Sequence, residues 1–429
     1  MTSPTMWKNS PHQDVIAGLR AEISRRLTGT DMSAAERDAQ VSRLVSQVLD
    51  QHARDSLAGG RMPLDPPDEK FVAVELRESF SALGPFESLL RDRRVTNIFV
   101  NGPVVWVAHS DGSKHQLPPL FTSRQEMIER IRDIAARSGV DERRFDRGMP
   151  RVSVRLPDGS RMFATLLARE PSVSIRRYAL LHTSLDELAA KHQLMDPVVR
   201  DLLTATVRAR KNMIICGGPY TGKTTFLRAA AKAIGPGERI ITIEDTDELA
   251  LDQDPDHPDC VALQAREANM EGEGGVDLAE LVRYALRMSP DRVFLGEARG
   301  GEVVPLLNCM SQGTDGSMAT IHTSSSKQAF TKLMVYAAQS EERLPFDATA
   351  PLVGVAVDFV VHLAWSANNH HRVVSSIREV LHAEGAEVIS NEIWRPGPDG
   401  AAVPAAPIRA ETVDELAAAG FNPDLLRGW

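Results

Sequence analysis

The feature that most constrains the fold is a short strand–turn–helix unit at residues 213–234. The apolar run MIIC ends at Cys216 and leads into the turn GGPYTGKTT, which opens into the alanine-rich stretch FLRAAAKAI. A strand that passes directly into a helix predicts a parallel sheet, because parallel strands need such crossover connections. The turn also satisfies the pattern G-x-x-x-x-G-K-[ST], in which backbone N–H groups and a helix N-terminus point at one anion. The unit therefore predicts a sheet type and a phosphate cradle.

The residues of this turn predict a nucleotide site that binds ATP and Mg²⁺. Lys223 would neutralise the β- and γ-phosphates, and Thr224 would offer its hydroxyl to Mg²⁺. Pro219 and Tyr220 stand where such loops usually hold small residues. If position 220 needs a positive φ, tyrosine costs about 1–2 kcal/mol there, which the charge-assisted contacts of a triphosphate outweigh. The predicted nucleotide-binding residues are Gly217, Gly218, Thr221, Gly222, Lys223, Thr224 and Thr225.

Strand–helix alternation continues to about residue 394 and brings three further motifs to predicted strand ends. RIITIED carries Glu244, RVFLGE ends in Glu297, and SMATIH ends in His322. The carboxyl ends of parallel strands meet at one ligand crevice. We therefore predict that Glu297 polarises the attacking water, that Glu244 helps to hold Mg²⁺ or that water, and that His322 couples the nucleotide state to the rest of the protein.

Two other clusters are interpreted as solvent-exposed segments. Residues 244–259 hold eight acidic side chains and no lysine or arginine. Their Asp-x-Asp-x-Asp spacing is like that of a calcium loop, but His257 replaces the required glycine and Leu263 the closing glutamate. His370 and His371 have no partner at metal-ligand spacing. We expect neither cluster to bind a metal.

The part before residue 196 divides into helical and α/β segments. Apolar residues at helical spacing predict two amphipathic helices within residues 14–56, broken by TGTD at 28–31. A Gly/Pro linker follows at 59–68, and short strands with one long helix continue to about residue 178. Residues 121–180 hold 13 arginines and eight acids. This basic segment is either a solvated face or a surface for phosphate or an acidic partner.

Composition narrows the class of protein. The net charge of −9 argues against direct binding of nucleic acid. Three widely spaced cysteines favour reduced thiols over disulfides or zinc. The first 14 residues contain no apolar core, so we expect no secretory leader. The longest apolar run, at 351–365, is too short to span a bilayer and contains Asp358. These features favour a cytoplasmic protein and leave docking on a membrane complex open.

The four motifs, in this order, resemble those of the secretion ATPase superfamily that serves type II secretion, type IV pili and type IV secretion. Its Walker A loop, aspartate box, atypical Walker B and histidine box correspond to GGPYTGKTT, TIEDTDEL, RVFLGEARGGE and GSMATIHTSS. The likeness covers roughly residues 79–380 and is greatest to the tight-adherence pilus branch, notably in LVRYALRMSPDRVFLGEARGGE. Two departures are the replacements at Pro219 and Tyr220, and REAN at 266–269 where the family favours RPPN.

The resemblance implies an α/β fold with a RecA-like phosphate-loop domain, preceded by a smaller α/β domain. It also implies a homohexamer on an inner-membrane pilus or secretion platform, with arginine contacts to phosphate from Arg176, Arg266 and Arg299. The expected boundaries are 1–65 for a helical extension, 66–182 for the α/β domain and 183–195 for a linker. The ATPase domain would then span 196–394, and a Pro/Ala-rich linker with a terminal helix would span 395–429.

Three alternatives remain open at this point. A conjugative type IV secretion traffic ATPase shares all four motifs, so the motifs do not separate it from a pilus motor. A nucleotide-binding scaffold without turnover is suggested by Tyr220 but opposed by the presence of Glu244, Glu297 and His322. A single-substrate phosphotransferase has no lid or acceptor motif in its favour.

Overall fold

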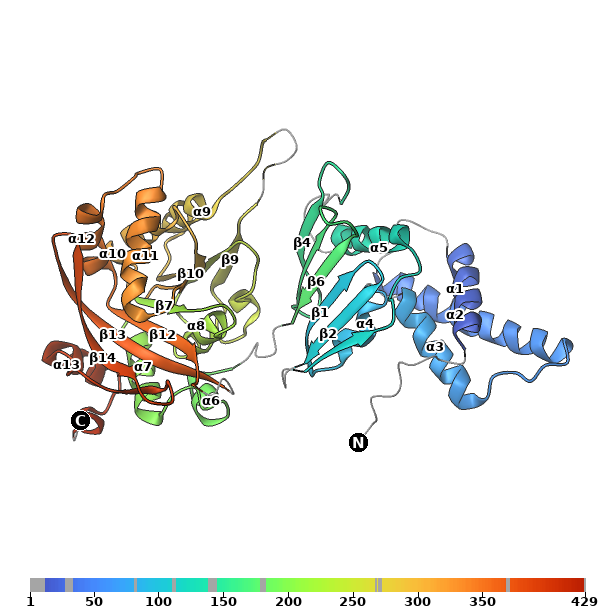
Figure 1. Cartoon of the computed structure of the whole chain (residues 1–429), viewed down its shortest axis with the longest axis horizontal. Coiled ribbons are helices and arrows are strands. Elements are labelled where there is room, and N and C mark those ends of the chain that lie inside the picture. The colour runs from blue at the N-terminus through green and yellow to red at the C-terminus, as the bar shows by residue number, and fades with distance from the viewer. Residues whose placement is uncertain are drawn as a thin grey trace. The chain divides into compact units, whose positions relative to one another are not determined.

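The computed structural model describes residues 12–27, 34–80, 83–109, 113–137, 145–177, 183–266, 268, 272–367 and 371–427. The chain forms two compact units, residues 1–179 and 180–429. Each unit has its own sheet, and both are drawn in Figure 1. The two units are described separately below.

The first unit begins with three helices, α1 (Gln13–Arg26), α2 (Ala34–Ala58) and α3 (Pro66–Phe80). Their apolar faces share one small core, which includes Ile23, Val45 and Leu76. Helix α3 begins inside the segment that the sequence predicts as a linker, because proline is well suited to the first turn of a helix. The predicted break at 28–31 lies outside the described residues.

The first unit continues as a six-stranded antiparallel sheet. Its order is β3-β2-β1-β6-β5-β4, and helices α4 (Phe86–Arg91) and α5 (Arg124–Arg137) pack on one face (Figure 1). Alternate strand residues such as Ile98, Val154 and Ile175 are buried in this core, as period-two patterning requires. The strands are β1 (Val95–Asn101), β2 (Val104–His109), β3 (Lys114–Leu117), β4 (Arg151–Arg155), β5 (Arg161–Thr165) and β6 (Ser172–Arg176).

The second unit is built on a nine-stranded sheet of order β15-β14-β13-β12-β7-β11-β10-β8-β9. The six strands from β12 to β9 in this order are parallel, and β13, β14 and β15 extend the sheet as an antiparallel meander. The strands are β7 (Met213–Gly217), β8 (Ile240–Glu244), β9 (Cys260–Gln264), β10 (Arg292–Ala298), β11 (Met318–His322), β12 (Phe359–Trp365), β13 (Arg372–Glu384), β14 (Glu387–Pro396) and β15 (Ala402–Pro404).

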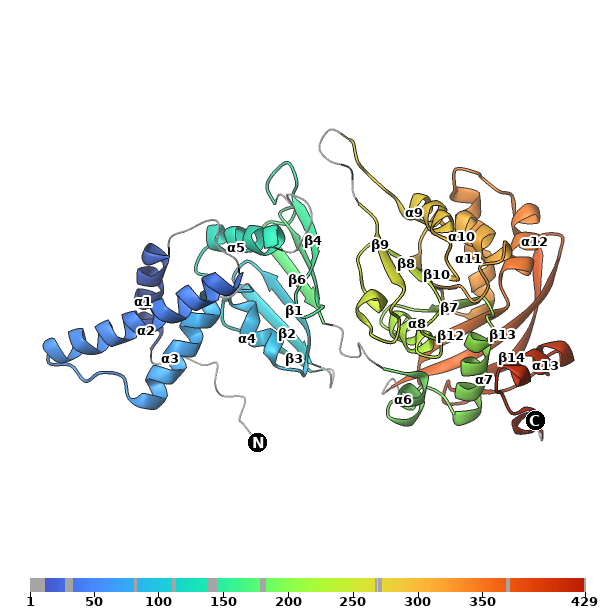
Figure 2. The ribbon, with the colours of Figure 1, turned by 180° about the vertical axis from the view of Figure 1, so that it is seen from behind.

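Helices cover both faces of this sheet, as the strand–helix alternation predicts (Figure 2). One face packs against α6 (Leu185–Ala190), α7 (Pro197–Arg208), α8 (Lys223–Ala231) and α13 (Ala410–Ala418). The other packs against α9 (Leu278–Ala285), α10 (Val303–Ser311), α11 (Ser326–Gln339) and α12 (Phe346–Ala356). Strands β7, β8 and β10 are almost wholly apolar because both of their faces are buried. The fold is therefore the α/β fold expected of a RecA-like domain.

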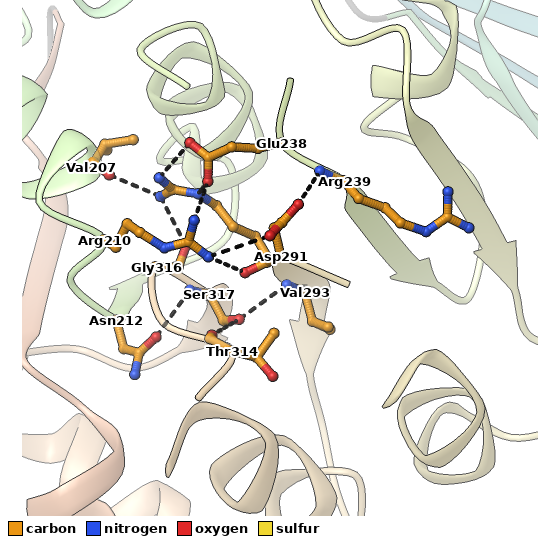
Figure 3. A network of polar contacts seen from close by, with 11 residues as sticks. Val207, Arg210, Asn212, Glu238, Arg239, Asp291, Val293, Thr314, Gly316 and Ser317 are labelled. Atoms are coloured by element: carbon orange, nitrogen blue, oxygen red, sulfur yellow. Dashed lines mark hydrogen bonds and ion pairs between the residues drawn. The ribbon is translucent and has the colours of Figure 1, made fainter. Parts of the chain in front are cut away.

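A polar network closes the amino ends of the parallel strands (Figure 3). Arg292, the first residue of β10 and 1% exposed, donates from Nε and Nη2 to the carboxylate of Glu238 at 2.7 and 3.0 Å and from Nη1 to the Val207 carbonyl. Arg210 donates to the same Glu238 carboxylate at 2.9 Å. Asn212 accepts from the Ser317 backbone amide at 2.9 Å. These hydrogen bonds and ion pairs connect the amino ends of neighbouring strands, so this edge of the sheet has a structural role.

The C-terminal segment packs on the second unit. Leu416 of α13 and Phe421 lie in the same core as β7 and α8. Buried Glu379 of β13 accepts from the Thr412 hydroxyl at 2.6 Å and from Arg409 Nε at 2.9 Å. These contacts tie the Pro/Ala-rich segment and its helix to the nine-stranded sheet.

Candidate active site

The phosphate loop connects β7 to α8 at the carboxyl edge of the sheet. Gly217 must be glycine, because a Cβ there would lie 2.4 Å from the Leu363 carbonyl oxygen. Tyr220 and Gly222 both have positive φ, 63° and 95°, so tyrosine does occupy a left-handed position that favours glycine. The Tyr220 side chain is 64% exposed, which leaves the backbone to form the cradle. Helix α8 starts at Lys223, where its N-terminus favours an anion.

A chain of polar contacts runs from the phosphate loop to the ends of two neighbouring strands, β11 and β10. Lys223 Nζ donates to the Gly217 and Gly218 carbonyls at 3.2 and 3.0 Å and lies 3.2 Å from His322 Nδ1. His322 Nε2 lies 2.8 Å from Glu297 Oε1. These contacts link the ends of β11 and β10 to the phosphate loop. The predicted residues Lys223, His322 and Glu297 therefore converge at one edge of the sheet.

Arg299 extends this chain beyond Glu297. Its Nη2 donates to Glu297 Oε2 at 2.8 Å, and its Nη1 donates to Asp245, the residue after β8. The Glu302 carboxylate accepts from the backbone amides of Arg299 and Gly300, which fixes the turn that carries the arginine. Asp245 and Glu302 are absent from the predicted set. Asp245 directly follows β8, and Glu302 directly precedes α10. These positions were the sequence signals available for the two residues.

The electrostatic setting of His322 favours a neutral ring. Burial lowers the pKa of His322, and the nearby Lys223 ammonium lowers it further, against the opposing charge of Glu297. A neutral imidazole has one N–H donor and one acceptor nitrogen. The hydrogen-bond network assigns the donor to Nε2, facing Glu297, and the acceptor to Nδ1, facing Lys223. His322 thus orients the Glu297 carboxylate relative to the phosphate loop.

Glu244 lies at the same edge but is buried. Its carboxylate is 4% exposed and accepts from the backbone amides of Glu248 and Leu249 at 3.1 Å. Burial raises the pKa of Glu244 to about 8, although these amide donors oppose the shift. The side chain also crosses Gly296, where an added Cβ would lie 2.7 Å from Glu244 Cγ. This contact explains why glycine precedes Glu297 where many such ATPases have aspartate.

The other two predicted arginines lie elsewhere. Arg266 follows β9, donates from Nε to the Gly274 carbonyl at 2.6 Å and forms a bridge with Val276, so it belongs to a loop of the second unit. Asn269 of the same motif lies outside the described residues. Arg176 ends β6 in the first unit and pairs across strands with Arg161. Among the predicted arginines, Arg299 is the one that the described contacts join to Glu297.

The predicted calcium-like loop is held by protein contacts. Lys232, which directly follows α8, donates to Asp254 at 2.8 Å and to Asp256 at 2.7 Å. Among the described residues, no group of three or more His, Cys, Asp or Glu side chains is placed to hold a metal ion. His371 contacts Ser366, whereas His370 lies outside the described residues.

A nine-stranded α/β sheet with a phosphate loop on its central strand β7, and with a carboxylate and a histidine on neighbouring strand ends, defines a phosphate-loop ATPase. The sequence profile of the family described as "Type II/IV secretion system protein" matches residues 84–393. The chain therefore belongs to this family, and it is an ATPase of the secretion class.

Two relatives match this chain over most of their own length. "Putative conjugal transfer protein Rv3659c" of Mycobacterium tuberculosis (strain ATCC 25618 / H37Rv) is 33% identical over 329 residues, which cover 74% of this chain and 90% of the relative. The type IV secretion system protein VirB11 of Brucella suis biovar 1 is 30% identical over 329 residues, which cover 69% and 88%. Both names support the predicted superfamily, whereas the tight-adherence branch stays a prediction.

Solved structures of this class also match. The VirB11 ATPase from the Brucella suis type IV secretion system, in complex with sulphate, is 26% identical, with a TM-score of 0.38 and coverage of 70% of this chain and 96% of that one. The pilus retraction motor PilT with bound ADP is 16% identical, with a TM-score of 0.49 and coverage of 77% and 84%.

Proposed function

We propose that this chain is a Mg²⁺-dependent ATPase that assembles into a homohexameric ring and drives a pilus or secretion platform in the inner membrane. The observation that carries the proposal is the contact chain Lys223–His322–Glu297 at the carboxyl edge of the parallel sheet. It joins a phosphate-binding lysine to a carboxylate able to polarise water. A nucleotide-binding scaffold without turnover would not need these groups in contact.

We propose distinct roles for the residues of the site. The loop amides, the N-terminus of α8 and Lys223 would hold the phosphates, and Glu297 would orient the attacking water. Thr224, in the first turn of α8, fits the position from which a phosphate loop offers a hydroxyl to Mg²⁺. Glu244 fits less directly, because its oxygens already accept two backbone amides. It would act on the metal through a bound water. Mg²⁺, when bound, would neutralise the charge shared by the β- and γ-phosphates.

Arginines from other elements would complete the site in the assembled ring. Arg155, Arg161 and Arg176 are direct cross-strand neighbours on β4, β5 and β6. The family resemblance supports phosphate-binding roles for Arg176 and Arg266, and we propose both roles here. Arg299 would act from within the same subunit.

A conjugative traffic ATPase is the second candidate, because the two relatives above bear names from conjugal transfer and type IV secretion. In that case the same motor would serve a different platform. The net charge of −9 favours a protein partner over direct contact with nucleic acid. The genes next to this one would separate the candidates, since pilin genes predict the first and relaxase genes the second.

We propose that the protein works at the inner face of the cytoplasmic membrane, bound to a platform protein. Within the described part of the chain, no helix is both long enough and apolar enough to cross a membrane. Membrane association would then depend on the platform, and removal of the platform gene should release the ATPase from the membrane fraction.

The ring proposal is tested by the ATPase rate per chain, measured against protein concentration. A site completed by a neighbouring subunit predicts a rate per chain that rises steeply with concentration and then levels off as the ring forms. Lys223→Ala at the plateau concentration should be inactive while eluting as the same oligomer. A rate per chain independent of concentration, at concentrations where the protein sediments as a monomer, would contradict the ring.

A further inference from the structure

The phosphate loop of this chain is held from outside by a residue far along the sequence. Arg372, the first residue of β13, donates from Nε to the Tyr220 carbonyl oxygen at 2.8 Å. Tyr220 is the loop residue with the left-handed φ of 63°. The Arg372 side chain also lies against the turn at Gly222, where an added Cβ would be 3.4 Å from Arg372 Cδ. The arginine therefore contacts the loop at its two left-handed positions.

The guanidinium is itself oriented by an aromatic ring. Arg372 Cζ lies 4.7 Å from the ring centroid of Trp365, the last residue of β12. Cation–π contact of this kind fixes the plane of a guanidinium and so directs its N–H groups. Strand β12 also approaches the loop directly, since the Leu363 carbonyl lies next to Gly217. The β12–β13 hairpin thus packs against the phosphate loop.

The loop needs such support because of its two unusual residues. Pro219 has no N–H to offer a phosphate. Tyr220 adopts a positive φ at a higher conformational energy than glycine would. In a planar trans peptide the carbonyl and the next N–H point in opposite directions. A hydrogen bond that holds the Tyr220 carbonyl toward Arg372 therefore directs the Thr221 N–H away from Arg372.

We propose that Arg372 is a positioning residue that holds the 220–221 peptide in its phosphate-binding orientation, with Trp365 holding the arginine. This inference rests on the proposed nucleotide-binding function and assigns a new residue to it. Arg372 acts through the loop backbone: its Nε donates to the Tyr220 carbonyl, and its guanidinium lies over the ring of Trp365. The arrangement makes left-handed tyrosine tolerable where glycine is the simpler solution.

A double-mutant cycle with Tyr220→Gly tests this coupling. The affinity for a fluorescent ATP analogue, together with kcat and KM for ATP, is measured for the wild-type ring, Arg372→Ala, Tyr220→Gly and the double variant. Arg372→Ala should weaken binding about tenfold and raise KM in proportion, with kcat changed less than twofold. In the Tyr220→Gly background the same substitution should weaken binding less than threefold, because glycine reaches positive φ without support.

The controls separate positioning from general damage. Arg395→Ala removes an exposed arginine from β14 of the same sheet and should leave affinity unchanged. Trp365→Leu should weaken binding by a smaller factor than Arg372→Ala, because the arginine keeps its donor but loses its orientation. Unfolding temperatures within 2–3 °C of wild type, a shift of about 1 kcal/mol or less, would show that every variant is folded.

Each outcome is decisive. Equal losses from Arg372→Ala in both backgrounds would overturn the inference, because the arginine would then not act through the conformation of residue 220. Unchanged affinity in Arg372→Ala would overturn it as well. A wild-type ring that binds no ATP analogue would overturn the proposed function itself, whereas binding with additive losses would overturn this inference alone.

Discussion

The two edges of the nine-stranded sheet carry similar residues in different settings. At the amino edge, Arg292 is 1% exposed and forms two hydrogen bonds to Glu238, with backbone carbonyls as further acceptors. At the carboxyl edge, Arg299 also pairs with a glutamate, but the side chains of Arg299 and His322 remain 50% and 41% exposed. Both edges contain an arginine–carboxylate pair, and one of them is open to solvent.

The two edges show that an arginine–carboxylate pair can stabilise the fold in one setting and serve a binding site in another. A buried, fully bonded pair resists change, because removal of one partner leaves a charge without compensation. A half-exposed pair contributes little to folding, so its position at a ligand crevice points to binding or catalysis. The comparison predicts that substitutions at the carboxyl edge affect turnover and those at the amino edge affect stability.

The largest expected effect is at the phosphate loop. Lys223→Ala removes the side-chain cation from the cradle and should lower the ATPase rate at least about 10³-fold, which corresponds to about 4 kcal/mol. Its free energy of unfolding should stay near that of wild type. Steady-state phosphate release and urea unfolding measure the two quantities. Lys327→Ala, a substitution in the first turn of α11, is the matched lysine control, and an equal loss of rate there would contradict the assignment.

The amino edge should respond in the opposite way. Arg292→Leu removes a buried arginine that donates to both Glu238 and the Val207 carbonyl, leaving Arg210 as the remaining cation beside Glu238, and should lower the free energy of unfolding by about 3 kcal/mol. The ATPase rate per folded chain should change less than twofold. Urea unfolding at fixed protein concentration measures the loss, with exposed Arg287→Leu as the control that should change stability by less than about 0.5 kcal/mol. A stable but inactive Arg292→Leu protein would break the comparison.

Glu244 links stability at the carboxyl edge to pH. The pKa of Glu244 is about 8 in the folded chain and 4.5 as the ordinary value, so the unfolded chain loses this proton first as pH rises. Its contribution to stability is therefore complete below pH 4.5 and is lost as pH rises toward 8, by up to about 1.4 kcal/mol per pH unit.

Glu244→Gln removes this titration and should flatten the dependence of unfolding free energy on pH between 5 and 8. Urea unfolding at several pH values measures the slope. Glu387→Gln, on the exposed start of β14, should keep the wild-type slope. Parallel profiles for wild type and Glu244→Gln would contradict the raised pKa.

The smallest of these effects is expected at His322. His322→Ala removes the group that orients Glu297 and should lower kcat about tenfold, or 1.4 kcal/mol, with a smaller change in KM. His322→Gln keeps a donor and an acceptor on one side chain and should retain more of the rate. If the two variants were equally impaired, the ring nitrogens would not act through the contacts to Glu297 and Lys223.

Sequence reasoning located the carboxyl edge because strand ends can be predicted. The first predicted strand ends at Cys216, one residue before the end of β7, whereas Glu244 and His322 end their strands in the structure as expected. Parallel pairing brings such strand ends together. The positive φ of Tyr220 was also anticipated as a condition. Short stretches of sequence were sufficient to predict both the strand ends and the backbone conformation of the loop.

Contacts between distant residues were beyond such patterns. The pairing of Arg299 with Asp245 joins residues 54 apart, and that of Arg372 with Tyr220 joins residues 152 apart. Strand β9 went unnoticed because it is an edge strand of intermediate burial, and α12 because Pro351 and Gly354 argue against a helix. The amino-edge network was missed because arginine and glutamate are usually read as surface residues.

The most direct test of the central claim is the ATPase rate of Glu297→Gln, measured with ATP binding in the same preparation. We propose that Glu297 acts in the chemical step and that the phosphate loop binds ATP. Glu297→Gln should therefore bind ATP as wild type does and hydrolyse it roughly 10²–10⁴-fold more slowly. Equal hydrolysis by wild type and Glu297→Gln would contradict the account.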